Sequence, residues 1–556
     1  MQTTFSKEQS TSDDILSKAR KQLEVLIHDI NESNIILVLD KTTAKNLRSF
    51  VQLHNLFENG IFLVEELSKK RKPFPKYCVV YLIYSIVDSL DIIAHDINPK
   101  KPSYRSAYIY YIEPPPESFW ERYAQPLSNP LIKSIRQTFF SFQCEDTFAL
   151  HFNAHLDLAC LMSNSMKEEC QKASKILSNV LKGMNYTPSI RFQQSVAAKA
   201  VALNVMEYTK VPYEDLDGKQ WPRCELLILD RTLDVCSPII HDYAYENLLR
   251  DFCDDLIASH DLGVDHLHWD TTWRTIRHLN IEDARSHVKK VYENFKELQQ
   301  LKKSSSLGNT SNSMLVKVIH ETAEQQKFVK EVEFHMSALN RIFERMEEVD
   351  FVKVFEVEQA LICFLRTESS QFSVEEILRH LKEIMRSKVS SNAKFRVLLL
   401  FSLTQIGENN KRLEELLEFA DIPRRKISTI HKIQSMRNLS SKTLNELAKK
   451  ATRERRCMFS RCPTVLKQVT ELAIKGTLPV SDFPYATAQS TGVTSSGAQS
   501  YGVSDTFVYM VGGFCTAEMH DIRNLMSSQK KAIFLGGTSH VSPESFIDQV
   551  ELIPPM

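Results

Sequence analysis

Short apolar runs alternate with amphipathic segments over the first part of the chain. Four of these runs are rich in β-branched or aromatic residues: NIILVLD (34–40), IFLVEE (61–66), CVVYLIY (78–84) and SAYIYYI (106–112). Continuous apolar runs of this kind are typical of strands that are buried on both faces of a parallel sheet. The segment between the first two runs is amphipathic at helical spacing and is closed by Gly60. This alternation predicts a doubly wound α/β domain.

A long helical region occupies the middle of the chain. Residues 148–211 have the pattern of long helices, and a short apolar strand at 226–230 follows them. Beyond that strand, the residues from 241 to 480 show almost no strand pattern. Their longest helical stretch covers 316–349 and comes after the flexible segment KSSSLGNTSNS at 303–313.

Two strand patterns return near the end of the chain, at DTFVYMVGG (505–513) and KKAIFLGG (530–537). Because two parallel strands do not make a stable sheet alone, we expect them to join the strand at 226–230. The helical block 241–480 is then an insertion into a second α/β domain. The Ser/Thr/Gly-rich stretch at 487–502 is typical of a loop on the return path.

Composition narrows the function classes. The 556 residues are enough for two to four domains. Lys+Arg and Asp+Glu are both 69, so no overall charge directs the chain to nucleic acid or to acidic membranes. No apolar run approaches the roughly 20 residues that cross a bilayer, and the first 30 residues lack the apolar core of a secretory signal. The 11 scattered cysteines favour reduced thiols in the cytosol.

Few patterns in the sequence indicate catalysis or a cofactor. Only 14 residues are glycine, and the motifs GxxxxGKS/T, GxGxxG and GxSxG do not occur. The turns at Gly512–Gly513 and Gly536–Gly537 follow strands and could bind phosphate, but tight strand-to-helix turns are the better interpretation. Asp230 ends the strand at 226–230, where α/β enzymes often keep a catalytic carboxylate. With Arg231 next to it and Pro238 beyond, we favour a structural ion pair at a domain junction.

Candidate metal ligands are sparse, so we expect no metal or cofactor. His151 and His155 have the i, i+4 spacing of two ligands on one helix face, but no third ligand accompanies them. His266 and His268, with Asp265, suit a polar loop better than a chelate, and Cys457 and Cys462 have no second pair. The basic run at 449–462 is either a solvated helix face or a docking patch for acidic helices or lipid headgroups.

Five motifs in order resemble the SM family, the syntaxin-binding proteins of SNARE-driven membrane fusion. The most distinctive is LLILDRTLDVCSPIIHDYAYENLL, residues 226–249. The others are ILVLDKTTAKNL with ENGIFLVEELSKKRKPFP, AKFRVLLLFSLTQIG with LEELLEFADIP, SRCPTVLKQVTELAIKGTLPVSDFPY, and FVYMVGGFCTAEMHDIRNLM with FLGGTSHVSPESFI. The resemblance covers nearly the whole chain.

The resemblance implies a three-domain arch of class α/β plus α. Its parts would be an α/β domain at 1–143, a discontinuous α/β domain at 144–240 and 478–556, and a mainly helical domain at 241–477. A hairpin at about 314–349 would receive the vesicle SNARE. Such proteins are not enzymes: they hold a syntaxin-type Qa-SNARE in a central cavity and template its zippering with the vesicle R-SNARE. Asp230 would then belong to the architecture.

The resemblance also assigns candidate contacts to syntaxin in the first domain. They are Asp40, Lys45, Gln52, Glu65 and Lys72. Lys45 stands for a usual arginine and loses its bidentate fork. Gln52 replaces a usual lysine, and Lys72 stands where neuronal members carry an acid. These departures argue against the grip on closed syntaxin that neuronal members have.

Two further features follow from the resemblance. Trp120, Ile132 and Gln137 correspond to a pocket for the N-terminal peptide of syntaxin, although Trp120 could instead cap the core of its own domain. Ala323 occupies the bend of the helical hairpin, where many members carry proline. Without a proline to break the helix, the hairpin could be extended by default.

The leading hypothesis is a monomeric cytoplasmic SM protein that is recruited peripherally to the plasma membrane or to secretory organelles. The sequence from Thr538 to Pro543 favours the secretory branch, acting in exocytosis. The alternatives are a paralogue in Golgi, endosomal or vacuolar traffic, and a subunit of a tethering complex. A remote alternative is an α/β hydrolase or NTPase that uses Asp230 with the glycine turns.

Overall fold

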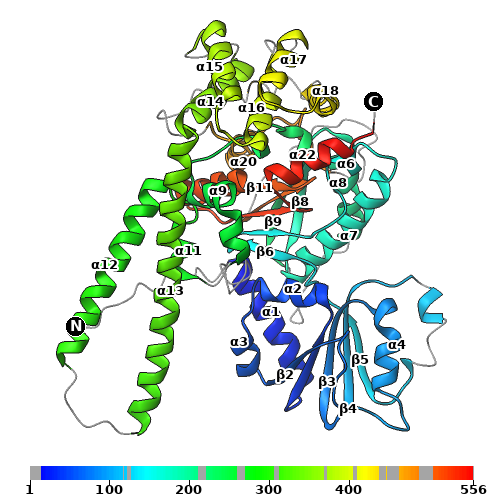
Figure 1. Cartoon of the computed structure of the whole chain (residues 1–556). Helices are drawn as coiled ribbons and strands as arrows, with labels where there is room; N and C mark the ends of the chain where they lie inside the picture. The colour runs from blue at the N-terminus through cyan, green and yellow to red at the C-terminus, as the bar shows by residue number, and fades with distance from the viewer. Residues whose placement is uncertain are drawn as a thin grey trace. The chain divides into compact units, whose positions relative to one another are not determined.

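The computed structural model describes residues 14–116, 118–121, 127–210, 221–259, 270–305, 312–367, 372–404, 410–437, 446, 462–486 and 505–554. Two compact units divide the chain (Figure 1). Unit 1 comprises Met1–Arg231, Thr470–Phe514 and Ile522–His540, and unit 2 comprises Thr232–Val469, Cys515–Asp521 and Val541–Met556. The combination of two large sheets, one two-stranded sheet and a large helical part confirms the predicted fold class, α/β plus α.

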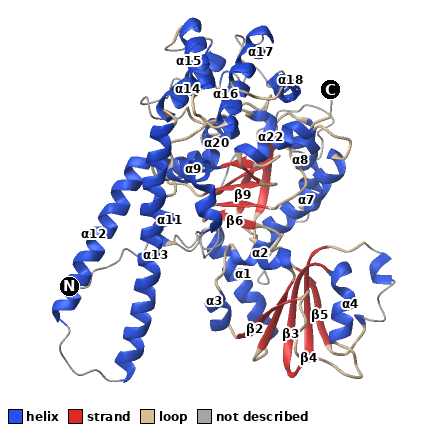
Figure 2. Ribbon diagram, viewed as in Figure 1, coloured by secondary structure: helices blue, strands red, loops and turns tan. Residues whose placement is uncertain are grey.

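The first sheet of unit 1 is entirely parallel and has the strand order β2-β1-β3-β4-β5 (Figure 2). Its strands are β1 (Ile35–Leu39), β2 (Ile61–Glu66), β3 (Phe74–Ser85), β4 (Tyr104–Glu113) and β5 (Ile132–Gln137). The order reverses between β1 and β3, as in doubly wound flavodoxin-like sheets. The accompanying helices are α1 (Ile15–Ile30), α2 (Lys41–Arg48), α3 (Leu53–Glu58) and α4 (Ile86–Asp96). Four of the strands were predicted from their apolar runs. The sequence pattern missed β5, an edge strand with three polar residues exposed.

The second sheet of unit 1 combines strands from distant parts of the chain in the order β6-β7-β12-β10-β9-β8. They are β6 (Gln143–Asp146), β7 (Ala149–His151), β8 (Thr187–Phe192), β9 (Arg223–Asp230), β10 (Asp505–Val511) and β12 (Ile533–Gly537). The pair β9–β10 is parallel, with Asp230 opposite Val511, and β10 pairs in turn with β12. The prediction that 505–537 joins the strand at 226–230 is therefore confirmed.

The prediction of continuous helices over 148–211 is partly wrong. Helices α6 (Leu158–Leu161), α7 (Met166–Gly183) and α8 (Val196–Tyr208) are present, but β7 and β8 are strands. β7 is three residues long, too short to show a period, and pairs with Gly537 through its last residue, His151. His155 lies beyond the strand, so these two histidines do not share a helix face.

Unit 2 is built mainly from helices. In the described part of the chain between β9 and β10, every named element is helical. The α-helices in that interval are α9 (Tyr245–Ser259), α11 (Thr271–Ile276), α12 (Ile281–Ser305), α13 (Asn312–Glu348), α14 (Phe351–Thr367), α15 (Val374–Arg386), α16 (Ser391–Leu403), α17 (Asn410–Phe419), α18 (Ile427–Arg437) and α20 (Val465–Ile474). Near the carboxyl end of the chain, α21 (Thr516–Gln529) and α22 (Pro543–Leu552) follow β10.

The longest helix, α13, contacts α12 and α9 (Figure 1). Its carboxyl half contributes Val332, Ala338, Leu339 and Ile342 to a buried cluster. Tyr245, Trp273 and Phe351, from α9, α11 and α14, belong to the same cluster. The root of α13 is thus held in an apolar core, which rigidly positions the helix that the family resemblance assigns to the SNARE-binding hairpin.

Candidate functional site

Asp40, the first of the candidate syntaxin contacts, lies at the carboxyl end of β1. One oxygen of the Asp40 carboxylate accepts a hydrogen bond from the backbone N–H of Thr43 at 2.7 Å, and the other accepts one from the backbone N–H of Tyr84. Asp40 is therefore the N-cap of α2 and ties this helix to β3. Lys45 follows on α2 with an exposed side chain. Asp40 therefore has a structural role at the start of α2, whereas Lys45 presents its charge to solvent.

Gln52 begins α3 and is half-buried. Its backbone N–H donates to Oδ1 of Asn55 at 3.3 Å, which satisfies one of the donors at the start of the helix. Helix α3 exposes two large apolar side chains to solvent: Leu53 is 60% and Phe57 is 50% exposed. Gln52 is thus a helix-start residue at the edge of an apolar helix face.

Glu65 lies in β2 beside Val38 of β1, so Glu65 and Asp40 are at the carboxyl ends of adjacent parallel strands. Burial raises the pKa of the Glu65 carboxyl, and the nearby Arg71 guanidinium opposes this increase. Its Oε2 atom is buried and has no hydrogen-bond partner among the described residues. Because this oxygen is buried, a bound partner could contact only the exposed part of the half-buried Glu65 side chain.

A buried ion pair holds the connection between β2 and β3. The Arg71 guanidinium donates to the Asp96 carboxylate at 2.5 Å, and the Tyr81 hydroxyl donates to the same oxygen at 2.8 Å. Arg71 also donates to the backbone carbonyl of Glu66 at 3.1 Å. Lys72 follows Arg71 and is exposed. Arg71 therefore fixes the backbone that carries Lys72, a role that the sequence pattern did not reveal because Asp96 is distant in the chain.

Trp120, Ile132 and Gln137 lie near the opposite edge of the same sheet. Trp120 is 36% exposed and packs against Phe119 and Tyr111, with ring centroids 5.2 and 6.0 Å away. Gln137 is opposite Tyr111 in the β4–β5 register and donates to the carbonyl of Ile112 at 3.1 Å. Ile132 is half-buried at the start of β5.

Phe119 fills the core near these residues, and Trp120 leaves about a third of its surface to solvent. The structure brings Trp120 and Gln137 together around Tyr111. The assignment of a peptide pocket to these residues stays a prediction.

Asp230 and Arg231 are buried at the end of β9. The Asp230 carboxylate accepts from the Ser195 hydroxyl, and its backbone N–H donates to Oε1 of Gln193 at 3.0 Å. Arg231 donates to the carbonyl of Gly513 at 3.2 Å. The boundary between the two units falls directly after Arg231. Pro238 is buried in the short 3-10 helix Ser237–Ile239.

Side chains of the protein pack directly against the two glycine turns, Gly512–Gly513 and Gly536–Gly537. Gly512 has φ +89°, and a Cβ atom there would lie 2.8 Å from Cβ of Arg231. A Cβ atom on Gly537 would lie 2.7 Å from the Phe514 ring. These glycines therefore permit close packing of protein groups. That packing accounts for glycine at both positions without a bound phosphate.

A polar network lies at the root of α13 inside unit 2. The Tyr245 hydroxyl and Nδ1 of His335 are 2.8 Å apart, and Nε2 of His335 is 3.0 Å from Asp270. Glu331 lies one turn before His335 and is 7% exposed. Burial, and after it the Asp270 carboxylate, raise the pKa of Glu331, Lys327 partly opposes them, and the resulting pKa is about 7. Ala323 lies within the same continuous helix, and its role as a bend stays a prediction.

Replacing Glu331 with glutamine is expected to stabilise the protein at pH 8. The pKa of Glu331 is raised in the folded state. The contribution of its protonated carboxyl to the stability of the fold is therefore complete below pH 4.5 and is lost as the pH rises through about 7. Glutamine stays neutral, so the gain at pH 8 should be about 1–2 kcal/mol after the loss of the Lys327 contact. Urea unfolding at pH 8 and at pH 4.5 measures this. An equal effect at both pH values would contradict the explanation.

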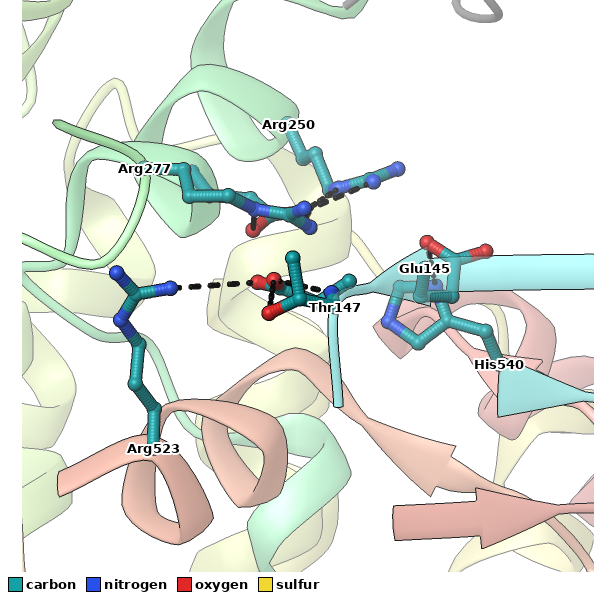
Figure 3. Close-up of polar contacts among 8 residues, drawn as sticks. Glu145, Thr147, Arg250, Arg277, Arg523 and His540 are labelled. Carbon is teal, nitrogen blue, oxygen red and sulfur yellow. Dashed lines mark hydrogen bonds and ion pairs between the residues drawn. The ribbon is translucent and has the colours of Figure 1, made fainter. Parts of the chain in front are cut away.

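Figure 3 shows two further groups of charged residues, one in each unit. In unit 2, Arg277 and Arg250 both donate to the carboxylate of Glu246. In unit 1, Glu145 lies 3.7 Å from His540, and Arg523 lies 3.8 Å from Asp146. Glu246 and Arg250 lie four residues apart on α9, but Arg277 and the partners in unit 1 come from separate segments, so the sequence did not indicate either group as a whole.

Several sequence predictions lie outside the described residues. These are the basic run from 449 to 461, the loop at 487–502, Asp265, His266, His268 and Cys457. Within the described segments, no group of three or more His, Cys, Asp or Glu residues could hold a metal ion. A search of the same segments found no helix that combines the length and the apolar character needed to cross a bilayer.

Comparisons with known proteins extend along nearly the whole chain. The model of the Sec1 family matches residues 35–549. Protein transport protein sec1 of Dictyostelium discoideum is 21% identical, over 92% of this chain and 94% of that protein. Vacuolar protein sorting-associated protein 45 of Schizosaccharomyces pombe is also 21% identical, over 97% of this chain and 98% of that protein.

Solved structures with the same fold are available. The Unc18–syntaxin 1 complex from Monosiga brevicollis matches 98% of this chain and 100% of its own, with TM-score 0.76 and 18% identity. The SM protein Vps45 in complex with the Qa SNARE Tlg2 matches 97% of this chain and 98% of its own, with TM-score 0.77 and 19% identity. At these identities the likeness establishes the fold.

Proposed function

The chain belongs to the Sec1 family of SM proteins, and from this membership we propose that it binds a syntaxin-type Qa-SNARE and regulates SNARE assembly in vesicle docking and fusion. The observation that carries the proposal is the match of the whole fold to two SM proteins whose structures are complexes with such partners. From the family resemblance of the sequence alone, we further propose that the chain binds the vesicle R-SNARE and the assembled SNARE bundle, and so templates their zippering. This activity needs no bond-breaking step. Binding to the chain would order the SNARE helices in advance, so that less conformational entropy is lost when they zipper.

The surface at the carboxyl end of β1 and β2 supports this proposal. There it combines the exposed cation of Lys45 with the half-buried carboxylate of Glu65, whereas the exposed Leu53 and Phe57 lie on α3, which leads into the amino end of β2. An amphipathic SNARE helix offers both apolar and charged positions at helical spacing. We therefore assign most of the affinity for the Qa-SNARE to Leu53 and Phe57. We assign the orientation of the bound SNARE helix to the charges of Lys45 and Glu65.

We further propose that the chain acts in exocytosis and is recruited to the plasma membrane or to secretory organelles through SNAREs. The resemblance of residues Thr538 to Pro543 to the secretory branch is the support for this choice. Thr538 is buried, and its hydroxyl donates to the carbonyl of Leu156 at 2.9 Å and accepts from the N–H of Gly512 at 3.0 Å. Because relatives of both the sec1 and the Vps45 type are similarly distant, a binding survey must decide between branches.

We also propose that the protein is not an enzyme. The Asp230 carboxylate is engaged by Ser195 and Gln193, and the glycine turns accommodate Arg231 and Phe514. A hydrolase or NTPase would instead need these groups directed at a substrate or a nucleotide. A thermal shift with the cytoplasmic region of a Qa-SNARE, and none with Mg-ATP, is the expected result. A shift with Mg-ATP that is lost in Asp230→Asn would favour the enzyme alternative.

Reversing the charge at Lys45 is expected to weaken Qa-SNARE binding about tenfold, the equivalent of about 1.4 kcal/mol. Lys45 is exposed on α2, so Lys45→Glu should leave folding intact and change the charge of the binding surface alone. Calorimetric titration of the purified chain with cytoplasmic regions of exocytic, Golgi and endosomal Qa-SNAREs provides the affinities. The titration that gives the tightest complex also identifies the branch.

Lys100→Glu is the matched control for this experiment. Lys100 is also exposed but precedes β4, so it lies toward the amino end of the strands, away from the carboxyl end of β1 where α2 begins. Its reversal should leave the affinity unchanged. Equal losses in the two variants would indicate a nonspecific charge effect and contradict the assignment of the surface. Light scattering on the same sample distinguishes a monomer from a subunit that needs a larger assembly.

A further inference from the structure

Two thiols of unit 2 lie next to each other although they are far apart in the sequence. Sγ of Cys363, in α14, is 4.0 Å from Sγ of Cys462, which comes shortly before α20. A disulfide bond is about 2.05 Å long, so about 2 Å of approach is needed to form one. Side-chain rotations alone cover a distance of that size.

Hydrogen bonds on both sides hold the two thiols in register. Oε1 of Gln359 accepts the backbone N–H of Cys462 at 2.9 Å, and Arg366 donates to the carbonyl of Pro463 at 3.0 Å. Gln359, Cys363 and Arg366 have i, i+4, i+7 spacing and therefore lie on one face of α14. A second nitrogen of Arg366 is 3.5 Å from Asp234 in the same unit. The segment at Cys462 is thus fastened to α14 before and after the sulfur atoms.

Cys363 is the more accessible of the two thiols. It is half-buried, whereas the other described cysteines are buried and Cys462 is only 2% exposed. Cys253 illustrates the contrast within unit 2, because burial raises the pKa of its thiol to about 11. A buried thiol of this kind is a poor nucleophile. An oxidant from solvent therefore reaches Cys363 first.

We propose that Cys363 and Cys462 are a redox modification site that forms a reversible intramolecular disulfide. Cys363 attacks a hydrogen peroxide oxygen, which gives a sulfenic acid and one water molecule. The Cys462 thiol then attacks this sulfur, forms the S–S bond and releases a second water molecule. Two thiols are oxidised by two electrons in total and one peroxide is reduced to two water molecules. A dithiol reductant reverses the reaction by thiol–disulfide exchange.

The bond would close a loop from residue 363 to residue 462 and join α14 to the start of α20. This loop contains α15 to α18, and its last residues are the basic run at 449–462. Closing a long loop removes conformational freedom from the unfolded chain and so stabilises the folded one. The inference does not depend on the proposed binding of SNAREs.

The test is a thiol count on the purified full chain, before and after mild oxidation with hydrogen peroxide. The 11 thiols of the denatured protein should fall to 9, and dithiothreitol should restore 11. Peptide mapping by mass spectrometry, without reduction, should identify the Cys363–Cys462 cross-link in the unaltered chain. The melting temperature of the oxidised form should rise by about 5 °C.

Two variants test whether Cys363 is one of the two thiols that are lost on oxidation. Cys363→Ser has 10 thiols and should keep all 10 after oxidation, whereas the control Cys253→Ala should fall from 10 to 8. A count that stays at 11 in the unaltered chain would overturn the proposal. A cross-link that joins Cys462 to Cys457, or two copies of the chain, would overturn it as well. Because peptide mapping uses the unaltered chain, it decides the question even if a variant fails to fold.

Discussion

Replacing Glu246 with alanine is expected to lower the free energy of unfolding by about 3–5 kcal/mol. Glu246 is fully buried in the first turn of α9, and its carboxylate accepts two hydrogen bonds from Arg277, at 2.8 and 2.9 Å. Arg250 donates to the same carboxylate at 3.0 Å. Alanine leaves Arg277, which is 3% exposed, as a buried charge without its carboxylate. Urea unfolding at pH 7, followed by circular dichroism, measures the loss.

The effect of Glu246 should depend on pH. Burial alone raises the pKa of this carboxyl, but Arg277 and Arg250 outweigh burial and lower the pKa to about 2. Its contribution to stability is therefore complete above pH 4.5 and is lost as the pH falls through about 2. The difference between the parent and Glu246→Ala should shrink over that interval. A difference that stays constant down to pH 2 would contradict the ion-pair explanation.

Arg250→Ala is the matched control for Glu246. The Arg250 side chain is 36% exposed, so its removal leaves Glu246 still paired with Arg277 and costs the protein about 1 kcal/mol or less. A loss as large as that of Glu246→Ala would show that the carboxylate needs both guanidinium groups. The comparison therefore separates the buried ion pair from its exposed neighbour.

Replacing Gly512 with alanine is expected to destabilise the protein by about 3–5 kcal/mol. Two costs add at this position. The backbone has φ +89°, which alanine rarely adopts, and its Cβ atom would lie 2.8 Å from Cβ of Arg231. Arg231 cannot move away easily, because it is fully buried and donates to the carbonyl of Gly513. Thermal and urea unfolding of the purified variant measure the sum.

Gly60→Ala isolates the backbone cost. Gly60 has the same φ of +89°, but no heavy atom lies within 4 Å of the position of its Cβ. This variant should lose only about 1–2 kcal/mol. If both variants lost the same amount, the contact with Arg231 would not limit the turn, and the close packing inferred at the end of β10 would be wrong.

The strands and the insertion could be predicted from the sequence because they depend on local runs and on the pairing needs of a sheet. The runs at 34–40 and 505–513 contain the continuous apolar stretches 35–39 and 507–511, and the orphan strands near the end required a partner. β5 and β7 could not be found in this way. One has polar exposed positions at a sheet edge, and the other is only three residues long.

The candidate site was predictable only as far as the family resemblance reached. Lys45 and Lys72 are exposed, as binding residues must be, but the buried supports could not be inferred. Arg71 depends on Asp96, and Cys363 depends on Cys462. Such pairs leave no spacing pattern, because only the tertiary fold brings their members together. Asp230 looked like a catalytic carboxylate for the same reason, since its partner Ser195 is invisible in the local sequence.

The pairing of β9 with β10 constrains how the chain folds during synthesis. Residues 231–504 separate the two strands, so β9 leaves the ribosome long before its neighbour exists. Until β10 is made, β9 has an open edge that can pair with another chain. The nascent protein therefore passes through a stage that invites aggregation, and chaperones should engage it from the appearance of β9 until residue 537 has emerged. Truncation before 505 would make that stage permanent.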